Sequence, residues 1–347
     1  MAETSAKQAE APAEVALNGG VITPDQAEPR DSSPPSSGSL RAAAEAQGSG
    51  LLWRVGGVIK TVRPHQWVKN LFVLAPVVFA REIFDTALLT RAASAFGVFC
   101  LLAGAVYTMN DLVDIEADRA HPVKRRRPIP SGRVPVPLAK ALALVLVIIA
   151  LGAALFIHVG FFIIAVIYFV QNLAYSFKLK NVPYLDVGLI ALGFVLRVEA
   201  GGYAAQISVS RYLIFCTALL ALFLGFGKRR HELAAAAIDV GKARASLKRY
   251  SVKGLDTALV ITALATIGIY LAYTLDPTTR AFFHTDYLWP STAFVVAGVG
   301  RFLFLVRSRP KAESPTQEML RDGPFVGILL LWIGLVLWIV YNLRPGG

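Results

Sequence analysis

The sequence predicts an all-α membrane protein, folded as a polytopic bundle of about nine transmembrane helices. Of its 347 residues, 55% are hydrophobic and 17% are charged, whereas a soluble domain carries about 25% charged residues. Apolar runs of about twenty residues recur along the chain, and each is long enough to cross a bilayer. The loops between the runs are alternately rich and poor in lysine and arginine, which is the positive-inside pattern of membrane proteins.

The expected elements follow one another from the N-terminus. Residues 1–50 are rich in Ala, Glu, Ser, Pro and Gly, and we expect them to form a disordered cytosolic tail. Residues 51–347 form the transmembrane domain, which starts with an amphipathic segment, 51–62, at the membrane interface. Residues 63–70 then run into a first span that ends near Ala80. Further spans are expected near residues 86–109, 137–156, 159–177, 184–204, 210–227, 256–275, 287–306 and 324–343.

Charge sets the expected orientation and excludes one class of partner. The basic loops place the N-terminus on the cytosolic side of the plasma membrane and the C-terminus outside. The net charge of +12 would favour nucleic acid as the partner of a soluble protein. Here the positive-inside pattern explains the charge, so we expect no nucleic-acid partner. The spacing of the two cysteines and five histidines indicates no disulfide, zinc or haem site. The basic loops are residues 110–136, 178–183, 228–255 and 307–323.

A row of polar side chains follows the second predicted span, and we call Asn110, Asp111, Asp114 and Asp118 the acidic row. Their spacing of three, four and seven residues would place all four on one face of a continuing helix. Carboxylates on one face repel each other, so a countercharge is expected. The basic run just downstream supplies part of it, and a divalent cation that bridges to a phosphate would supply more. The alternative is a solvated acidic helix end followed by positive-inside residues.

Other charged side chains lie on the same cytosolic side or inside an apolar run. Lys178 and Lys180 follow the fourth span, where they either anchor the helix at the interface or contribute to the site. Asp186 begins the next helix, where a carboxylate also stabilises the helix N-terminus. Arg197 and Glu199 lie in the middle of an apolar run, and ionised groups there almost always face a polar interior. They form either a polar track into the bundle or an Arg–Glu pair that holds helices together.

The sixth span ends in a basic segment that contains Lys228 and Arg229. Taken alone, this segment is a positive-inside signal. Together with Lys69, Arg127 and Lys180 it provides several cations that face the acidic row. Such a site can hold a metal–diphosphate complex and additional phosphate groups at the same time.

The acidic row, Asn110-Asp111-x-x-Asp114-x-x-x-Asp118, and the segment 127–132 that follows resemble the UbiA superfamily of intramembrane transferases. The resemblance extends over roughly residues 60–345. It implies a helical bundle around a central cavity that opens sideways to lipid. It also implies Mg²⁺ that grips the diphosphate of a donor and is held by Asn110, Asp111, Asp114 and Asp118.

One departure from the family pattern selects a branch within it. Prenyltransferases of the family carry a second aspartate-rich motif after the sixth span, whereas residues 228–233 of this chain are mostly basic. A basic loop suits three anions, a sugar phosphate, a diphosphate and a lipid phosphate, better than a second carboxylate cluster does. The chain resembles instead the decaprenyl-phosphate phosphoribosyltransferase branch, with matching segments at 63–70, 175–180, 185–187 and 193–197.

This resemblance implies a Mg²⁺-dependent transfer of the 5-phosphoribosyl group from phosphoribosyl diphosphate to decaprenyl phosphate or a similar polyprenyl phosphate. Diphosphate is released, and the product is a precursor of the arabinose donor for cell-wall arabinogalactan. Asp111, Asp114 and Asp118 are the expected catalytic residues. The expected substrate-binding residues are Lys69, Tyr107, Asn110, Lys124, Arg127, Tyr175, Lys178, Lys180, Asp186, Arg197, Lys228 and Arg229.

Two alternatives remain open at this point. A UbiA-type prenyltransferase would transfer the prenyl group of a prenyl diphosphate to an aromatic acceptor. A lipid or solute transporter without chemistry would also place charged side chains inside the membrane. The sequence leaves open, in addition, whether the chain forms a homo-oligomer in the membrane lipid.

Overall fold

The computed structural model describes residues 50–342 apart from 81, 83, 178, 239–248, 309–317 and 320. Residues 1–49 of the expected tail, and Lys178, therefore lie outside the described residues. Every regular element in the described ranges is a helix, which confirms the predicted all-α class.

The chain enters the bundle through three short elements, and the last two lie where the first span was expected. α2 (Leu51–Val62) is the amphipathic segment, and it ends at Arg63, whose φ of 53° is left-handed. Pro64 then starts η1 (Pro64–Leu74), a 3₁₀ helix that leads into α3 (Ala75–Phe79). A residue that precedes proline avoids the α-helical conformation, so α2 stops at Arg63. A 3₁₀ helix as long as η1 is uncommon, and such stretches often mark functional positions.

Seven helices in the described part of the chain are long and apolar enough to cross a membrane, which agrees with a multi-pass membrane protein. A further apolar helix, α14 (Gly323–Asn342), has a shorter apolar stretch, Gly323–Ile339. The expected count of nine spans is therefore not confirmed. The seven are α4 (Thr86–Val113), α6 (Val136–Ile157), α7 (Val159–Phe177), α8 (Leu185–Ala205), α9 (Arg211–Ile238), α10 (Val252–Leu275) and α12 (Thr292–Ser308), the last extended by η6 (Trp289–Ser291).

Short elements connect the long helices at the two ends of the bundle. Three of them, α5 (Ile115–Ala120), η2 (Lys124–Arg126) and η3 (Leu179–Asn181), lie near the acidic row. The fourth, α11 (Pro277–Phe283), follows the C-terminal end of α10.

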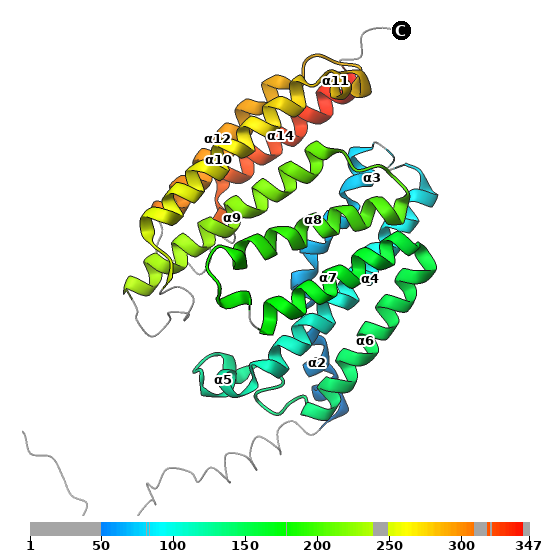
Figure 1. Cartoon of the computed structure of the whole chain (residues 1–347), viewed down its shortest axis with the longest axis vertical. Coiled ribbons are helices and arrows are strands. Elements are labelled where there is room, and N and C mark those ends of the chain that lie inside the picture. Colours follow the sequence, from blue (N-terminus) through cyan, green and yellow to red (C-terminus); the bar gives the residue numbers. More distant parts are fainter. Residues whose placement is uncertain are drawn as a thin grey trace, which may run out of the picture. The chain divides into compact units, whose positions relative to one another are not determined.

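The long helices share two main apolar cores. α4, α6, α7 and α8 pack with η1 around Phe99, Phe161 and Tyr168. α9, α10 and α12 pack around Phe223 and Phe302, and Figure 1 shows α10, α12 and α14 lying side by side. α8 contacts α9, and this contact joins the two groups of helices.

Glycine permits one close approach that matters for the site. A Cβ atom on Gly201 of α8 would lie 1.9 Å from the backbone oxygen of Val73 in η1. No larger residue fits there without moving backbone, so Gly201 allows η1 to lie directly against α8. Together with the hydrogen bond from Arg197 to Asn70, this contact holds the end of the 63–70 segment against α8.

Candidate active site

The acidic row lies where α4 ends. α4 stops at Val113, Asp114 has φ −92° and ψ 9°, and α5 starts at Ile115. The backbone hydrogen bonds from Asp114 to Asn110 and from Asp118 to Asp114 keep the helical i to i−4 pattern across the break. The spacing read from the sequence is therefore preserved, although the helix is interrupted.

Two members of the acidic row are buried and share an arginine. Asp111 and Asp118 are each 2% exposed. An Nη1 atom of Arg127 lies 2.6 Å from Asp118 and 3.2 Å from Asp111. Arg63 adds a second contact to Asp111 at 2.5 Å, and Lys124 lies 3.8 Å from Asp118. The basic run downstream thus supplies countercharge to buried carboxylates, and these two do not belong to a solvated helix end.

Asp114, the third carboxylate of the acidic row, forms an ion pair with Lys180, which lies between α7 and α8. Lys180 Nζ, in η3 after α7, lies 2.9 Å and 3.1 Å from the two carboxylate oxygens of Asp114. Both side chains are about one-third exposed, so this pair remains open to water. The contact joins the fourth predicted span to the acidic row and favours a site role for Lys180 over a purely interfacial one.

Asp186 and Arg229 form a separate network where α8 begins, near the C-terminal part of α9. Arg229 Nε lies 2.7 Å from Asp186, and Arg229 Nη1 lies 2.6 Å from Glu232. The hydroxyl of Tyr250 donates to Asp186 and accepts from the backbone N–H of Tyr184. Burial and the hydrogen bond to Asp186 raise the pKa of Tyr250 above its ordinary value. Asp186 is fully buried, so the geometry favours a helix-fixing role for this pair, and substrate binding by it stays a prediction.

Arg197 lies deep in the bundle, and its hydrogen-bond partners in the described residues are all neutral. Its Nε donates to Asn70 at 2.9 Å, Nη1 to the Gly193 carbonyl at 2.8 Å and Nη2 to the Tyr168 hydroxyl at 2.8 Å. The Arg197–Glu199 pair considered from the sequence is not among the ion pairs of these residues, because positions two apart on a helix face different directions. Arg197 is 7% exposed, which makes it a buried cation held by dipoles.

Lys69 lies within electrostatic reach of Lys228, Arg197 and Arg63, and Tyr107 lies within reach of Arg197 and Arg63. Lys69 lies on η1, outside the seven membrane-spanning helices. Its side chain keeps contact with solvent but is surrounded by protein. Loss of hydration, and then the charges of Lys228, Arg197 and Arg63, lower the pKa of Lys69 to about 8. The Arg63 guanidinium lies 5.1 Å from the centre of the Tyr107 ring.

Tyr175 is half-buried near the end of α7 and lies within electrostatic reach of Arg229. The structure therefore places it closer to the Asp186–Arg229 network than to Arg197. A role at the ribose stays a prediction for this residue.

Several residues of the site escaped prediction from sequence. Arg63 and Asn70 stand in the 63–70 segment that was singled out, yet neither was assigned a role. Tyr168 and Tyr250 lie in segments without a motif, and only their contacts with Arg197 and Asp186 reveal them.

The predicted metal ligands are not gathered around one point. In the ranges that the structure describes, no group of three or more His, Cys, Asp and Glu side chains could hold a metal ion as they stand. The physical reason is that Arg63, Arg127 and Lys180 separate the carboxylates. The donor set nevertheless suits Mg²⁺, because three carboxylates and an amide in one short segment offer the hard oxygen atoms that this ion prefers.

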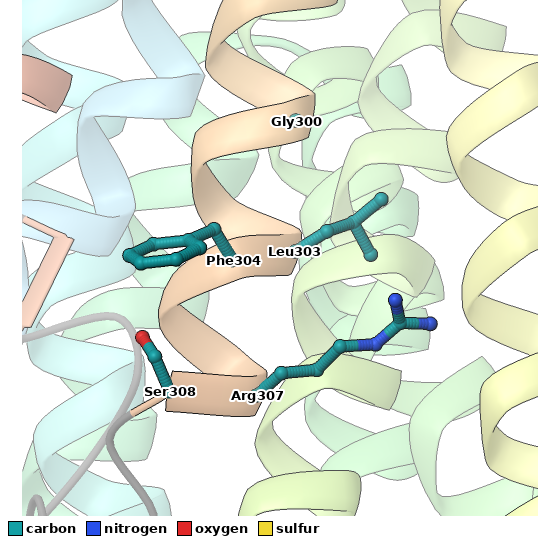
Figure 2. A pocket seen from close by; sticks show the side chains of 5 residues that line it. All are labelled: Gly300, Leu303, Phe304, Arg307 and Ser308. Carbon is teal, nitrogen blue, oxygen red and sulfur yellow. The ribbon is translucent and has the colours of Figure 1, made fainter.

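A large apolar cavity of about 1210 Å³ has walls from η1, α3, α9, α10, α11, α12 and α14. The walls include Phe72, Leu220, Tyr270 and Trp332. A second hollow of about 380 Å³ is lined by Gly300, Leu303, Phe304, Arg307 and Ser308 of α12. Figure 2 shows that Phe304 projects to one side of α12 and Leu303 and Arg307 to the other. None of these five is a predicted site residue.

Comparison with known proteins establishes the family. Residues 71–321 match the family model of the UbiA prenyltransferase family. The chain belongs to the UbiA prenyltransferase family. This confirms the resemblance inferred from the acidic row and from the segment that follows it.

Named relatives within the UbiA family cover most of the chain. The decaprenyl-phosphate phosphoribosyltransferase of Mycolicibacterium smegmatis is 34% identical over 293 residues, which is 81% of this chain and 92% of that protein. The enzyme of the same name from Corynebacterium glutamicum is 38% identical over 224 residues, 63% of this chain and 68% of that protein. A solved UbiA homolog from Archaeoglobus fulgidus, bound to GPP and Mg²⁺, aligns with a TM-score of 0.60 at 21% identity. The alignment covers 82% of this chain and 99% of that one, and it confirms the fold.

Proposed function

We propose that this protein transfers the 5-phosphoribosyl group of phosphoribosyl diphosphate to decaprenyl phosphate, or a similar polyprenyl phosphate, and releases diphosphate. The observation that carries the proposal is the similarity to two relatives named decaprenyl-phosphate phosphoribosyltransferase, at 34% and 38% identity over most of their length. The site is consistent with it, because the reaction brings together three anionic groups and the site is rich in cations.

The cations have the reach that phosphate binding needs. Arg63, Lys124, Arg127 and Lys180 currently neutralise the carboxylates of the acidic row. Arginine and lysine side chains are long, and their charged ends form strong hydrogen bonds to phosphate oxygens. A bound diphosphate would therefore pair with these cations, and the carboxylates that they leave would be free to hold a divalent metal.

Mg²⁺ is the proposed metal, and Asn110, Asp111, Asp114 and Asp118 are the residues that would hold it. When bound, such an ion neutralises the charge that develops on a leaving diphosphate. The proposal is supported by the oxygen-rich donor set and by the Archaeoglobus fulgidus homolog, which was solved with Mg²⁺ bound.

The chain's own residues then act mainly by positioning and charge neutralisation. The lipid phosphate is already ionised at neutral pH, so its attack on C1 of the ribose needs no strong general base. Arg127 and Lys180 stabilise the departing diphosphate, and Tyr107 lies between the acidic row and Arg197, where it would bound the ribose. Inversion at C1 is the expected stereochemical outcome of a single displacement. Fixed cations in a site with little water are effective at this kind of stabilisation.

The proposed location is the plasma membrane, with the N-terminus and the acidic row on the cytosolic side and the C-terminus outside. The basic loops support this orientation through the positive-inside rule. Phosphoribosyl diphosphate, a soluble and highly charged donor, would then reach the acidic row from the cytosol.

A direct transfer assay tests the proposal. Membranes that contain the protein receive labelled phosphoribosyl diphosphate, decaprenyl phosphate and Mg²⁺, and label should become extractable with lipid. Asp114→Ala should abolish the transfer. The matched control is Glu116→Ala, because Glu116 lies two residues further on but is 80% exposed and pairs only with Arg119 in the described contacts. The control should keep the activity.

A second candidate function is the transfer of a prenyl group from a prenyl diphosphate. The Archaeoglobus fulgidus homolog bound to GPP favours it, since that structure shares the fold. The same membranes are therefore offered a labelled prenyl diphosphate with an aromatic acceptor. Consumption of the prenyl diphosphate, without any lipid-extractable phosphoribosyl label, would overturn the first proposal.

A further inference from the structure

The candidate site contains two groups of cations that differ in their partners. Arg63, Arg127 and Lys180 hold carboxylates of the acidic row at the cytosolic end of α4. Arg197 is buried and Lys69 is exposed, and no ion pair of either with a carboxylate is found in the described residues. Two groups with such different neighbours suit two different anions.

We propose that Lys69 and Arg197 bind the phosphate of the lipid acceptor, with its chain in the apolar cavity beside Phe72, while the donor's diphosphate binds at the acidic row. This inference rests on the proposed function and assigns two of its three phosphates.

Arg197 is positioned as a receptor for an anion. Three of its five N–H groups are accounted for by neutral acceptors, namely the Asn70 amide, the Gly193 carbonyl and the Tyr168 hydroxyl. These contacts fix the guanidinium without neutralising it. A buried cation surrounded only by dipoles is costly, and an anionic ligand removes that cost.

Lys69 brings a second cation to the same place. Asn70, which accepts from Arg197 at 2.9 Å, is the next residue of η1. Loss of hydration, and then the charges of Lys228, Arg197 and Arg63, lower the pKa of Lys69, so these cations lie within electrostatic reach of it. Tyr107, Tyr168 and Cys100 are further titratable side chains near Arg197. Mutual repulsion between the cations is relieved when one anion binds between them.

The surroundings indicate that this anion carries a long apolar chain. Phe72, one turn beyond Lys69, lines the cavity of about 1210 Å³. Its ring meets Phe194 edge-on at 4.9 Å, and the Arg197 guanidinium lies 5.5 Å from the centre of the Phe194 ring. Phe72 and Phe194 therefore connect the wall of the apolar cavity with the surroundings of the Arg197 guanidinium. A polyprenyl phosphate uses both features, whereas a sugar phosphate has no group for the apolar cavity.

The arrangement also suits the displacement itself. Tyr107 lies one helical turn before Asp111 and within electrostatic reach of both Arg63 and Arg197. A ribose beside Tyr107 would have diphosphate on its cytosolic side and the lipid phosphate on its deeper side. An oxygen of the lipid phosphate forms the new bond to C1, the C1–O bond to diphosphate breaks, and diphosphate leaves with that electron pair. Nucleophile and leaving group on opposite sides of C1 are the geometry that inversion requires.

Binding measured without turnover tests the assignment. Protein purified in nanodiscs is titrated with decaprenyl phosphate in the absence of donor, and separately with phosphoribosyl diphosphate and Mg²⁺. Lys69→Met and Arg197→Met should each raise the Kd for decaprenyl phosphate at least tenfold and leave the Kd for the donor within about twofold. Asp114→Asn should do the reverse. Lys60→Met, an exposed lysine on α2, should change neither Kd.

The outcomes separate this inference from the proposed function. If Lys69→Met raises the Kd for the donor and leaves the Kd for decaprenyl phosphate unchanged, Lys69 and Arg197 bind the sugar 5-phosphate. The inference is then overturned. If neither Kd changes, the inference is equally wrong. A wild-type protein that binds decaprenyl phosphate through Lys69 but does not bind the donor would retain the lipid site and refute the transferase function. Because Lys69 keeps contact with solvent, its variant stays informative even if Arg197→Met fails to fold.

Discussion

Replacing Arg229 with methionine should destabilise the bundle strongly, because the change leaves a buried carboxylate without its cation. Asp186 is fully buried and the Arg229 side chain is 4% exposed. Breaking a buried ion pair by removing one partner costs about 3–5 kcal/mol. At about 2 °C per kcal/mol for a chain of this size, the melting temperature in detergent should fall by about 6–10 °C. Tyr250→Phe removes one hydrogen bond to the same charge and should cost about 1.5–3 kcal/mol.

The neighbouring residue supplies the matched control for this experiment. Arg230 pairs with Asp256 at 2.9 Å, but the two side chains are 22% and 35% exposed. An ion pair open to solvent contributes about 0–1 kcal/mol, so Arg230→Met should shift the melting temperature by no more than about 2 °C. Thermal unfolding followed by tryptophan fluorescence measures all three variants. An unchanged melting temperature for Arg229→Met, together with a lost affinity for substrate, would refute the helix-fixing role and restore Asp186 and Arg229 as binding residues.

Three further changes have defined outcomes. Lys180→Met should lower phosphoribosyl transfer at least tenfold. It should change the free energy of unfolding by less than about 1 kcal/mol, since its ion pair is open to water. A large drop in melting temperature with the activity kept would contradict the site role of Lys180. Affinity for decaprenyl phosphate should fall as the pH rises through the pKa of Lys69, about 8 in the free protein and higher with the anion bound. Lys69→Arg should hold the affinity to higher pH, because arginine stays charged. Gly201→Ala should displace η1 and lower both the stability of the protein and the rate of transfer, since its Cβ would meet the Val73 backbone at 1.9 Å. Gly97→Ala, which has open space around it, should be tolerated. Equal effects of the two changes in melting and transfer assays would show that the close contact is unimportant.

Part of the site was readable because it depends on local spacing alone. The acidic row repeats at helical intervals, and the structure keeps the i to i−4 hydrogen bonds that such spacing assumes. The same residues predicted that the carboxylates need a countercharge, and Arg127 and Lys124 provide it. The helical class and the membrane-spanning character followed from composition and from the length of the apolar runs.

Other features were missed because they depend on contacts between distant segments. The expected first span is a 3₁₀ helix, since Pro64 stops α2 and Gly201 draws η1 against α8. Asp186 was read as a helix cap or a binding residue, yet Arg229 and Tyr250 arrive from α9 and the loop that follows it. No pattern in the sequence around Asp186 predicts Arg229 or Tyr250 as its partner.

The sequence by itself determined that this is a helical membrane protein of the UbiA family, with a row of carboxylates and basic segments on one side. Only the tertiary structure decided which cation meets which carboxylate, and that Arg197 is held by neutral groups beside an apolar cavity. The physical reason is that spacing along one helix fixes which side chains share a face, whereas partners from other helices are chosen by how those helices pack.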